Sequence, residues 1–164
     1  MTERTRRVLK AGGIAAIVLL LAAQLVRPAR INPPVPESRS LEAVARITPA
    51  VSAVLERACR DCHSNRTVWP WYSNVAPVSW FVIDHVNHAR SHLNFSTWAD
   101  YEPRRAGKLL RSMCGETKNG YMPLPSYLLV HRHARLTSDD IAALCAWSSV
   151  EFAKLNLPME RQGR

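Results

Sequence analysis

The chain has 164 residues, with 22 Lys or Arg against 13 Asp or Glu and a net charge of +9. Such a charge can indicate a nucleic-acid partner, but seven basic residues against two acids lie in the first forty residues, where they suit membrane topology. The excess of positive charge in the rest of the chain is small, which argues against a nucleic-acid-binding protein. A mildly basic face could still steer an acidic partner.

The N-terminus predicts a cytoplasmic tail and a transmembrane signal anchor over residues 1–27. Four cations within residues 4–10 precede an uncharged run at residues 11–26, and Arg27 closes the run. The run is short for a membrane span, and residues 8–9 bring it within range. A cleaved signal peptide is the alternative, although no small-x-small cleavage site follows the run.

A proline-rich linker is predicted over residues 28–40. Pro28, Pro33, Pro34 and Pro36 give an extended, semi-rigid spacer rather than a packed element. Residues 41–157 then have the length of one domain, and residues 158–164 form a short tail.

Residues 59–63 read Cys-Arg-Asp-Cys-His, the C-x-x-C-H pattern of covalent c-type haem attachment. A tight turn places both sulfurs on one side of the porphyrin and the imidazole beneath it. We therefore predict covalent attachment at Cys59 and Cys62, with His63 as the fifth iron ligand, and one haem c from the one pentad. In bacteria this attachment occurs outside the cytoplasmic membrane. The N-terminus would thus make the chain a single-pass inner-membrane protein whose haem domain faces the periplasm.

Apolar spacing in the domain predicts helices and no convincing strand pair. Thr48-Pro49 begins a helix that leads into Cys59, and residues 64–76 form a loop. Further helices are expected at residues 77–91, at residues 103–117 before Asn119-Gly120, and from a cap at residues 137–140 to residue 152. The predicted fold is all-α: a transmembrane helix followed by a class I cytochrome c-like domain.

Met122 is the predicted sixth ligand of the iron. It lies in the segment Gly-Tyr-Met-Pro-Leu-Pro at residues 120–125, whose prolines would stiffen the loop around a weakly binding thioether. Met122 could instead fill a core gap. Met113 is a weaker rival, because its helical neighbours place it in the core.

Histidines leave a second possibility open for the sixth ligand. His85, His88 and His92 share one helix face, which fits a solvated surface, a bis-histidine haem or a separate metal site. His131 and His133 are expected at the surface or near a haem propionate.

Aromatic residues and two further cysteines surround this chemistry. Trp69, Trp71, Tyr72 and Tyr127 are predicted to wall the haem crevice, with generic core packing as the alternative. Cys114 and Cys145 are the remaining thiols. Outside the cytoplasm such a pair often forms a disulfide, although buried free cysteines also occur.

The chain resembles the small bacterial haem-binding domain proteins, which are membrane-anchored and cytochrome c-like, over residues 41–152. Four segments carry the resemblance: Trp-Pro-Trp-Tyr-Ser at 69–73, Ala-Pro-Val-Ser-Trp at 76–80, His-Leu-Asn-Phe-Ser at 92–96 and Met-Pro-Leu-Pro-Ser-Tyr-Leu-Leu at 122–129. The resemblance implies one covalent haem on the pentad with Met122 opposite His63. Tyr121 replaces an acidic residue common in the family, which puts a partner contact through that charge in doubt.

These features together predict a membrane-anchored monohaem cytochrome that carries single electrons between redox partner proteins in or near the membrane. It is expected to be a carrier rather than an enzyme, with no catalytic residue or small-molecule substrate identified. The main alternative is a haem enzyme or a gas or redox sensor with a labile distal ligand. A thiol oxidoreductase using the C-x-x-C cysteines ranks last, since the βαβ context of thioredoxin-like folds is missing.

Overall fold

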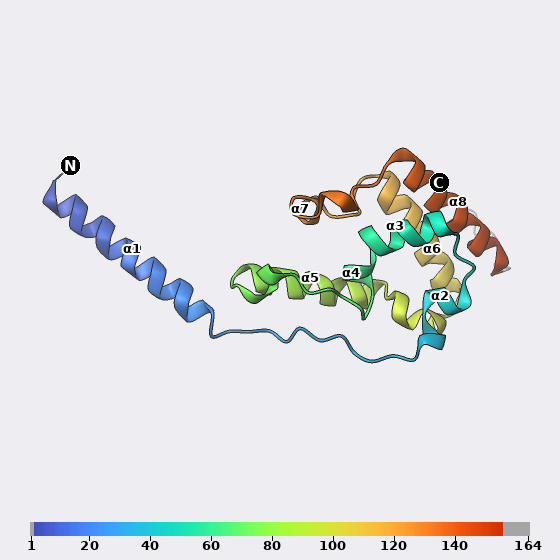
Figure 1. Cartoon of the computed structure of the whole chain (residues 1–164), viewed down its shortest axis with the longest axis horizontal. Helices are drawn as coiled ribbons and strands as arrows, with labels where there is room; N and C mark the ends of the chain where they lie inside the picture. Colours follow the sequence, from blue (N-terminus) through green and yellow to red (C-terminus); the bar gives the residue numbers. More distant parts are fainter. Residues whose placement is uncertain (1, 156–164) are drawn as a thin grey trace.

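The computed structural model describes residues 2–155, which form helices joined by loops, with no β-strand among them (Figure 1). The α-helices are α1 (Glu3–Ala23), α2 (Leu41–Val44), α3 (Pro49–Ala58), α4 (Arg60–His63), α5 (Val78–His92), α6 (Pro103–Lys118), α7 (Pro125–Leu128) and α8 (Ser138–Lys154). Four short 3₁₀ segments are η1 (Glu37–Arg39), η2 (Trp71–Asn74), η3 (Phe95–Asp100) and η4 (Arg132–Ala134). The expected helical class is confirmed. The predicted domain end at residue 157 and the tail at residues 158–164 lie outside the described residues.

Local signals in the sequence explain where the main helices begin and end. The hydroxyl of Thr48 accepts from the backbone N–H of Val51, and Pro49 occupies the first turn of α3. Thr137 and Asp140 form a capping box at the start of α8. After α6 the chain turns at Gly120, whose φ of 72° suits a residue without a side chain.

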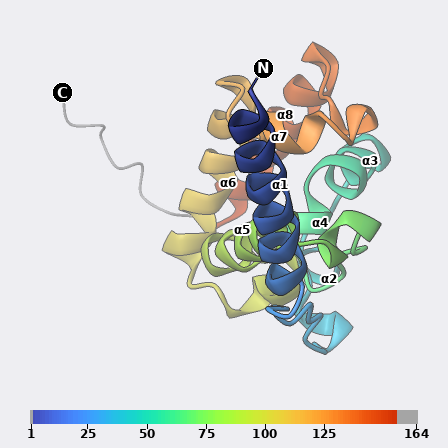
Figure 2. The same ribbon diagram turned by 90° about the vertical axis from the view of Figure 1, so that its left-hand side faces the viewer.

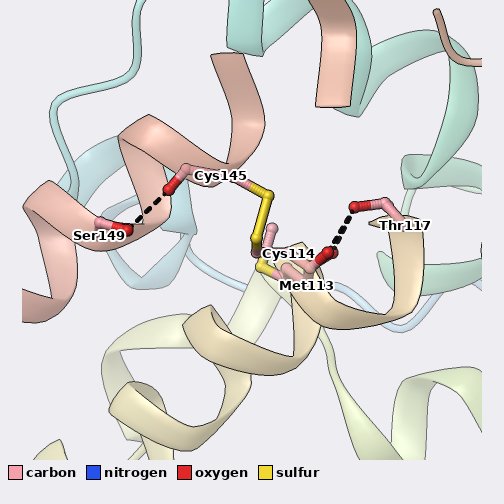
Figure 3. Close-up of a disulfide and its surroundings, with 5 residues drawn as sticks. All are labelled: Met113, Cys114, Thr117, Cys145 and Ser149. Atoms are coloured by element: carbon pink, nitrogen blue, oxygen red, sulfur yellow. Dashed lines mark hydrogen bonds between the residues drawn. A yellow bond between two sulfur atoms is a disulfide. The ribbon is translucent and has the colours of Figure 1, made fainter. Parts of the chain in front are cut away.

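The hydrophobic core lies where α3 and α6 pack against α8. Its members come from α2, α3, η3, α6 and α8: Leu41, Val51, Leu55, Phe95, Trp98, Ala106, Leu110, Met113, Leu144 and Trp147. An ion pair between Arg57 and Asp140 joins α3 to the start of α8. A disulfide between Cys114 and Cys145 joins α6 to α8, with an S–S distance of 1.99 Å (Figure 3). The ion pair and the disulfide link α3 and α6 to α8, and these three helices form one half of the domain.

The other half of the domain is more open. Helix α5 packs against α4 and η2, whereas α7 lies next to η4. In Figure 1, α7 and the first turns of α5 extend to the same side, away from α8. The pentad in α4 lies between these two halves.

The prediction of a transmembrane helix is wrong, and with it the single-pass inner-membrane location. Among residues 2–155, no helix is both long and apolar enough to cross a membrane. Charged residues occupy the first turns of α1, and its uncharged part at residues 11–23 spans about 20 Å at 1.5 Å per residue, whereas a hydrocarbon core is about 30 Å thick.

Helix α1 projects from the domain, as Figures 1 and 2 show together. Its end is fixed by Gln24, whose side-chain amide donates to the Ala76 carbonyl at 3.0 Å and accepts from the Ala76 N–H at 3.0 Å. The Trp80 indole also donates to the Val26 carbonyl at 2.8 Å. The helix therefore leaves the domain beside the junction of η2 and α5.

Candidate haem site

The pentad folds as one short turn at the end of α3. Cys59 ends α3, and its carbonyl accepts from the N–H groups of Cys62 at 3.2 Å and His63 at 3.0 Å. The pentad therefore forms the tight turn that its spacing predicts. Its two thiols line different cavities, because Cys59 shares one with His63 and Cys62 lines the other.

His63 is oriented by a backbone carbonyl from a distant segment. Its Nδ1 lies 3.0 Å from the carbonyl oxygen of Leu93, just after α5. With Nδ1 donating, the tautomer leaves Nε2 as the lone-pair nitrogen, and such second contacts are typical of histidines that bind metals. Burial lowers the pKa of His63 and favours the neutral imidazole, the form that binds iron.

The two pentad thiols are held in their protonated form. Burial raises the pKa of Cys59 to about 12, with a further contribution from Cys62. Burial also raises the pKa of Cys62 to about 11, and the neighbouring Asp61 carboxylate adds to the effect. Reactive C-x-x-C thiols have pKa values below that of free cysteine, so these two lack the environment of a thiol oxidoreductase.

Two mostly apolar cavities adjoin the pentad. Cys59 lines one of them, and Cys62 lines the other. The first, of about 430 Å³, is lined by Cys59, His63 and Met122 together with Leu93, Phe95, Leu109, Met113 and Leu144. The second, of about 360 Å³, is lined by Cys62, Trp71, Tyr72 and Tyr127 and by apolar residues of α5. Each volume lies in the range of small-molecule sites. Thiols, a neutral imidazole and apolar walls around such space fit a haem.

Met122 reaches the His63 cavity from the loop after α6. The carbonyl of Glu116, in the last turns of α6, accepts from the N–H groups of Tyr121 at 2.9 Å and Met122 at 3.1 Å. Thr117 fixes the same turns, since its hydroxyl donates to the Met113 carbonyl at 2.8 Å. Figure 3 shows Met113 and Thr117 beside the Cys114–Cys145 disulfide. The disulfide thus lies one turn from the atoms that hold the Met122 loop.

The aromatic residues expected at the crevice divide into two groups. Trp71, Tyr72 and Tyr127 line the Cys62 cavity, although Trp71 is 77% exposed. Trp69 lines neither cavity and instead faces Arg90, whose guanidinium carbon lies 5.9 Å from the ring centroid. Arg90 donates to the Ser64 carbonyl and to the Thr67 hydroxyl at 2.8 and 2.7 Å, so it fixes the chain that leaves the pentad.

A cluster of polar residues lines part of the Cys62 cavity. The Tyr127 hydroxyl donates to Asp61 Oδ2 at 3.0 Å, and the Tyr72 hydroxyl lies 2.6 Å from His131 Nε2. The rings of Tyr127 and His131 stack with centroids 4.2 Å apart. Burial and then the Asp61 carboxylate raise the pKa of Tyr127 far above its usual value, so the phenol remains a donor.

The three histidines of α5 do not act as one group. His92 lines the His63 cavity, His85 lines the Cys62 cavity, and His88 lies exposed with its Nε2 3.1 Å from that of His92. No cluster of three or more His, Cys, Asp or Glu side chains is placed to hold a metal ion within residues 2–155. His92 therefore remains an alternative to Met122. Met113 is buried in the core, as its neighbours suggested, and also lines the His63 cavity.

Several contributors could not be identified from the sequence. Leu93 and Glu116 contribute through their backbone carbonyls. Because every residue has a backbone carbonyl, no pattern of side chains in the sequence identifies these two. Asp61 and His131 come together from positions 70 residues apart. The sequence places Asp61 in the pentad and predicts His131 at the surface or near a propionate, but it does not predict that the two lie in one cluster.

The comparison with protein families places the chain among haem-binding proteins. A protein-family model described as a haem-binding domain matches residues 18–150, most of the chain. Searches of the curated proteins and of the solved structures gave no match. The match supports haem binding, and the class I cytochrome c architecture stays a prediction.

Proposed function

The chain belongs to the haem-binding domain family, and from this premise we propose that it is a monohaem c-type cytochrome that carries single electrons between protein partners. Cys59 and Cys62 would hold the haem covalently, with His63 and Met122 as axial ligands. When bound, haem supplies reversible one-electron exchange at its iron. The chain's own part is to orient these ligands and to exclude water from them.

The orientation of His63 is the observation that carries this proposal. Its Nδ1 bond to the Leu93 carbonyl fixes the ring, and the ring lines the same cavity as Met122. A neutral imidazole and a thioether on one apolar cavity match His/Met ligation, which favours ferrous iron and a high reduction potential. The raised pKa values of Cys59 and Cys62 disfavour the thiol oxidoreductase alternative.

A pyridine haemochrome assay on the purified full chain tests the attachment. We expect the spectrum of two thioether linkages and one haem per chain. Replacing Cys59 or Cys62 by Ala should shift the spectrum to one linkage, and replacing both should leave haem that acid-acetone extracts. Absence of thioether-linked haem in the unaltered protein would refute the proposal.

The position of His92 favours a second candidate, a haem sensor or enzyme with a labile distal ligand. His92 shares the cavity with His63 and Met122, together with the polar residues Ser112 and Glu116. Polar groups beside an open distal position suit binding of a small exogenous ligand. Ferrous protein that binds carbon monoxide rapidly without any substitution would favour this candidate over an electron carrier.

A further inference from the structure

Two hydrogen bonds cross the Cys62 cavity between segments far apart in sequence. On one side, Asp61 belongs to α4 and Tyr72 to η2; on the other, Tyr127 belongs to α7 and His131 precedes η4. Tyr127 donates to Asp61 Oδ2, and Tyr72 bonds to His131 Nε2. The stacked rings of Tyr127 and His131 connect the two bonds into one unit.

The α4 side of this unit is anchored independently of α7. Asp61 Oδ1 accepts from the Val68 N–H at 3.1 Å, and the Asp61 carbonyl accepts from the Thr67 hydroxyl at 2.6 Å. Tyr72 lies in η2, which packs against α5. These contacts hold Asp61 and Tyr72 in place whether or not α7 is present.

The α7 side has little apolar burial to hold it in place. Leu129 and Val130, which follow α7, line the Cys62 cavity but remain 76% and 63% exposed, and Pro125 and Ser126 are also exposed. Hydrophobic stabilisation scales with the apolar area removed from water, so this segment gains little of it. The side-chain bonds of Tyr127 and His131 are therefore a large part of what keeps α7 against the cavity.

We propose that Tyr127, His131, Tyr72 and Asp61 form a clasp that holds α7 at the Cys62 cavity and, through the loop before α7, keeps Met122 in the His63 cavity, so that opening the clasp admits exogenous ligands to the iron. Met122 precedes α7 by only three residues, so a movement of α7 is transmitted directly to its loop. Tyr127 and Tyr72 are positioning residues in this scheme. The ligand-binding part of the inference rests on the proposed function.

The test compares the haem-loaded full chain with its Tyr127→Phe and Tyr72→Phe variants, which keep the rings and lose the hydroxyls. The first measurement is the rate at which imidazole binds to the ferric protein, and the second is amide hydrogen exchange at residues 124–130. We expect each variant to raise both rates about tenfold, equivalent to about 1.4 kcal/mol, because a hydrogen bond to a charged or buried partner is removed. Exchange in α3 and α8 should stay unchanged.

Tyr121→Phe is the matched control, since it removes an exposed hydroxyl from the same loop, and it should change neither rate. Asp61 accepts through both carboxylate oxygens, from the Val68 N–H and from Tyr127, so Asp61→Asn, with one acceptor oxygen and no charge, and Asp61→Ala should both raise the two rates as Tyr127→Phe does. Imidazole and exchange rates within twofold of the unaltered protein in both Tyr variants would overturn the clasp, even if the melting temperature fell. If no haem attaches, the proposed function fails, and the exchange measurement alone decides about the clasp.

Discussion

The two sides of the haem crevice are built differently. The His63 side rests on α3, α6 and α8, with Leu55 and Leu144 each 1% exposed and an ion pair and a disulfide between helices. On the α7 side, Leu129 and Val130 are 76% and 63% exposed, and a few side-chain bonds hold the segment. One side of the crevice is therefore held by core packing, whereas the other depends on a small number of polar contacts.

A pair of leucine substitutions tests this difference most strongly. Leu144→Ala removes a buried side chain that lines the His63 cavity and should lower the free energy of unfolding by about 2–5 kcal/mol. Leu129→Ala, at a 76% exposed position that lines the Cys62 cavity, should lower it by clearly less than Leu144→Ala does. Denaturant unfolding of the haem-loaded protein measures both. Equal losses would show that the two sides do not differ in packing.

The disulfide should stabilise both sides, with a particular effect on the Met122 loop. Replacing Cys114 and Cys145 together by Ser opens a link across 31 residues and should cost about 3 kcal/mol. Because Glu116 holds Met122 from the next turn of α6, hydrogen exchange at residues 120–124 should also accelerate. Thermal unfolding with and without reductant measures the first effect. An unchanged melting temperature in reductant would contradict it.

Met122→Ala examines the sixth ligand directly, with Met113→Ala as the control. The first change should abolish the methionine-to-iron charge-transfer band and lower the reduction potential, on the order of 100 mV. The second should reduce stability and leave the band intact, because Met113 is a buried core residue. If Met122→Ala keeps both the band and the potential, Met122 is not the ligand. His92→Ala then tests the remaining candidate.

The sequence predicted the regular parts of this molecule well because local chemistry determines them. Thr48 and Thr137 cap helices through their own side chains, and the pentad needs only one turn to direct its groups. The prediction at α1 failed because it counted residues 24–26, which lie beyond the end of the helix, and residues 8–9, which Lys10 separates from the uncharged run. The clasp and the Leu93 contact depend on tertiary packing between distant segments, for which spacing along the chain holds no signal.

The smallest expected effect concerns acid stability on the His63 side. The Arg57 guanidinium, which donates to Asp140, and the capping bonds of Thr137 lower the pKa of Asp140 to about 2. A carboxyl whose pKa is depressed on folding stabilises the native state above its unfolded pKa of about 3.9 and loses this contribution as pH falls through the folded value. The contribution should therefore disappear between about pH 4 and pH 2. Solvent screening limits it to about 1 kcal/mol.

Asp140→Asn isolates this contribution. Above pH 4 the variant should be less stable than the unaltered protein, and near pH 2 the two should converge, as measured by urea unfolding across the series. Asp139→Asn, which changes an exposed acid in the same first turn, should give a smaller difference at all pH values. Because Arg57 and Asp140 join α3 to α8, the acid effect should appear as faster hydrogen exchange in those helices before it reaches α7. Earlier exchange in α7 would contradict this order.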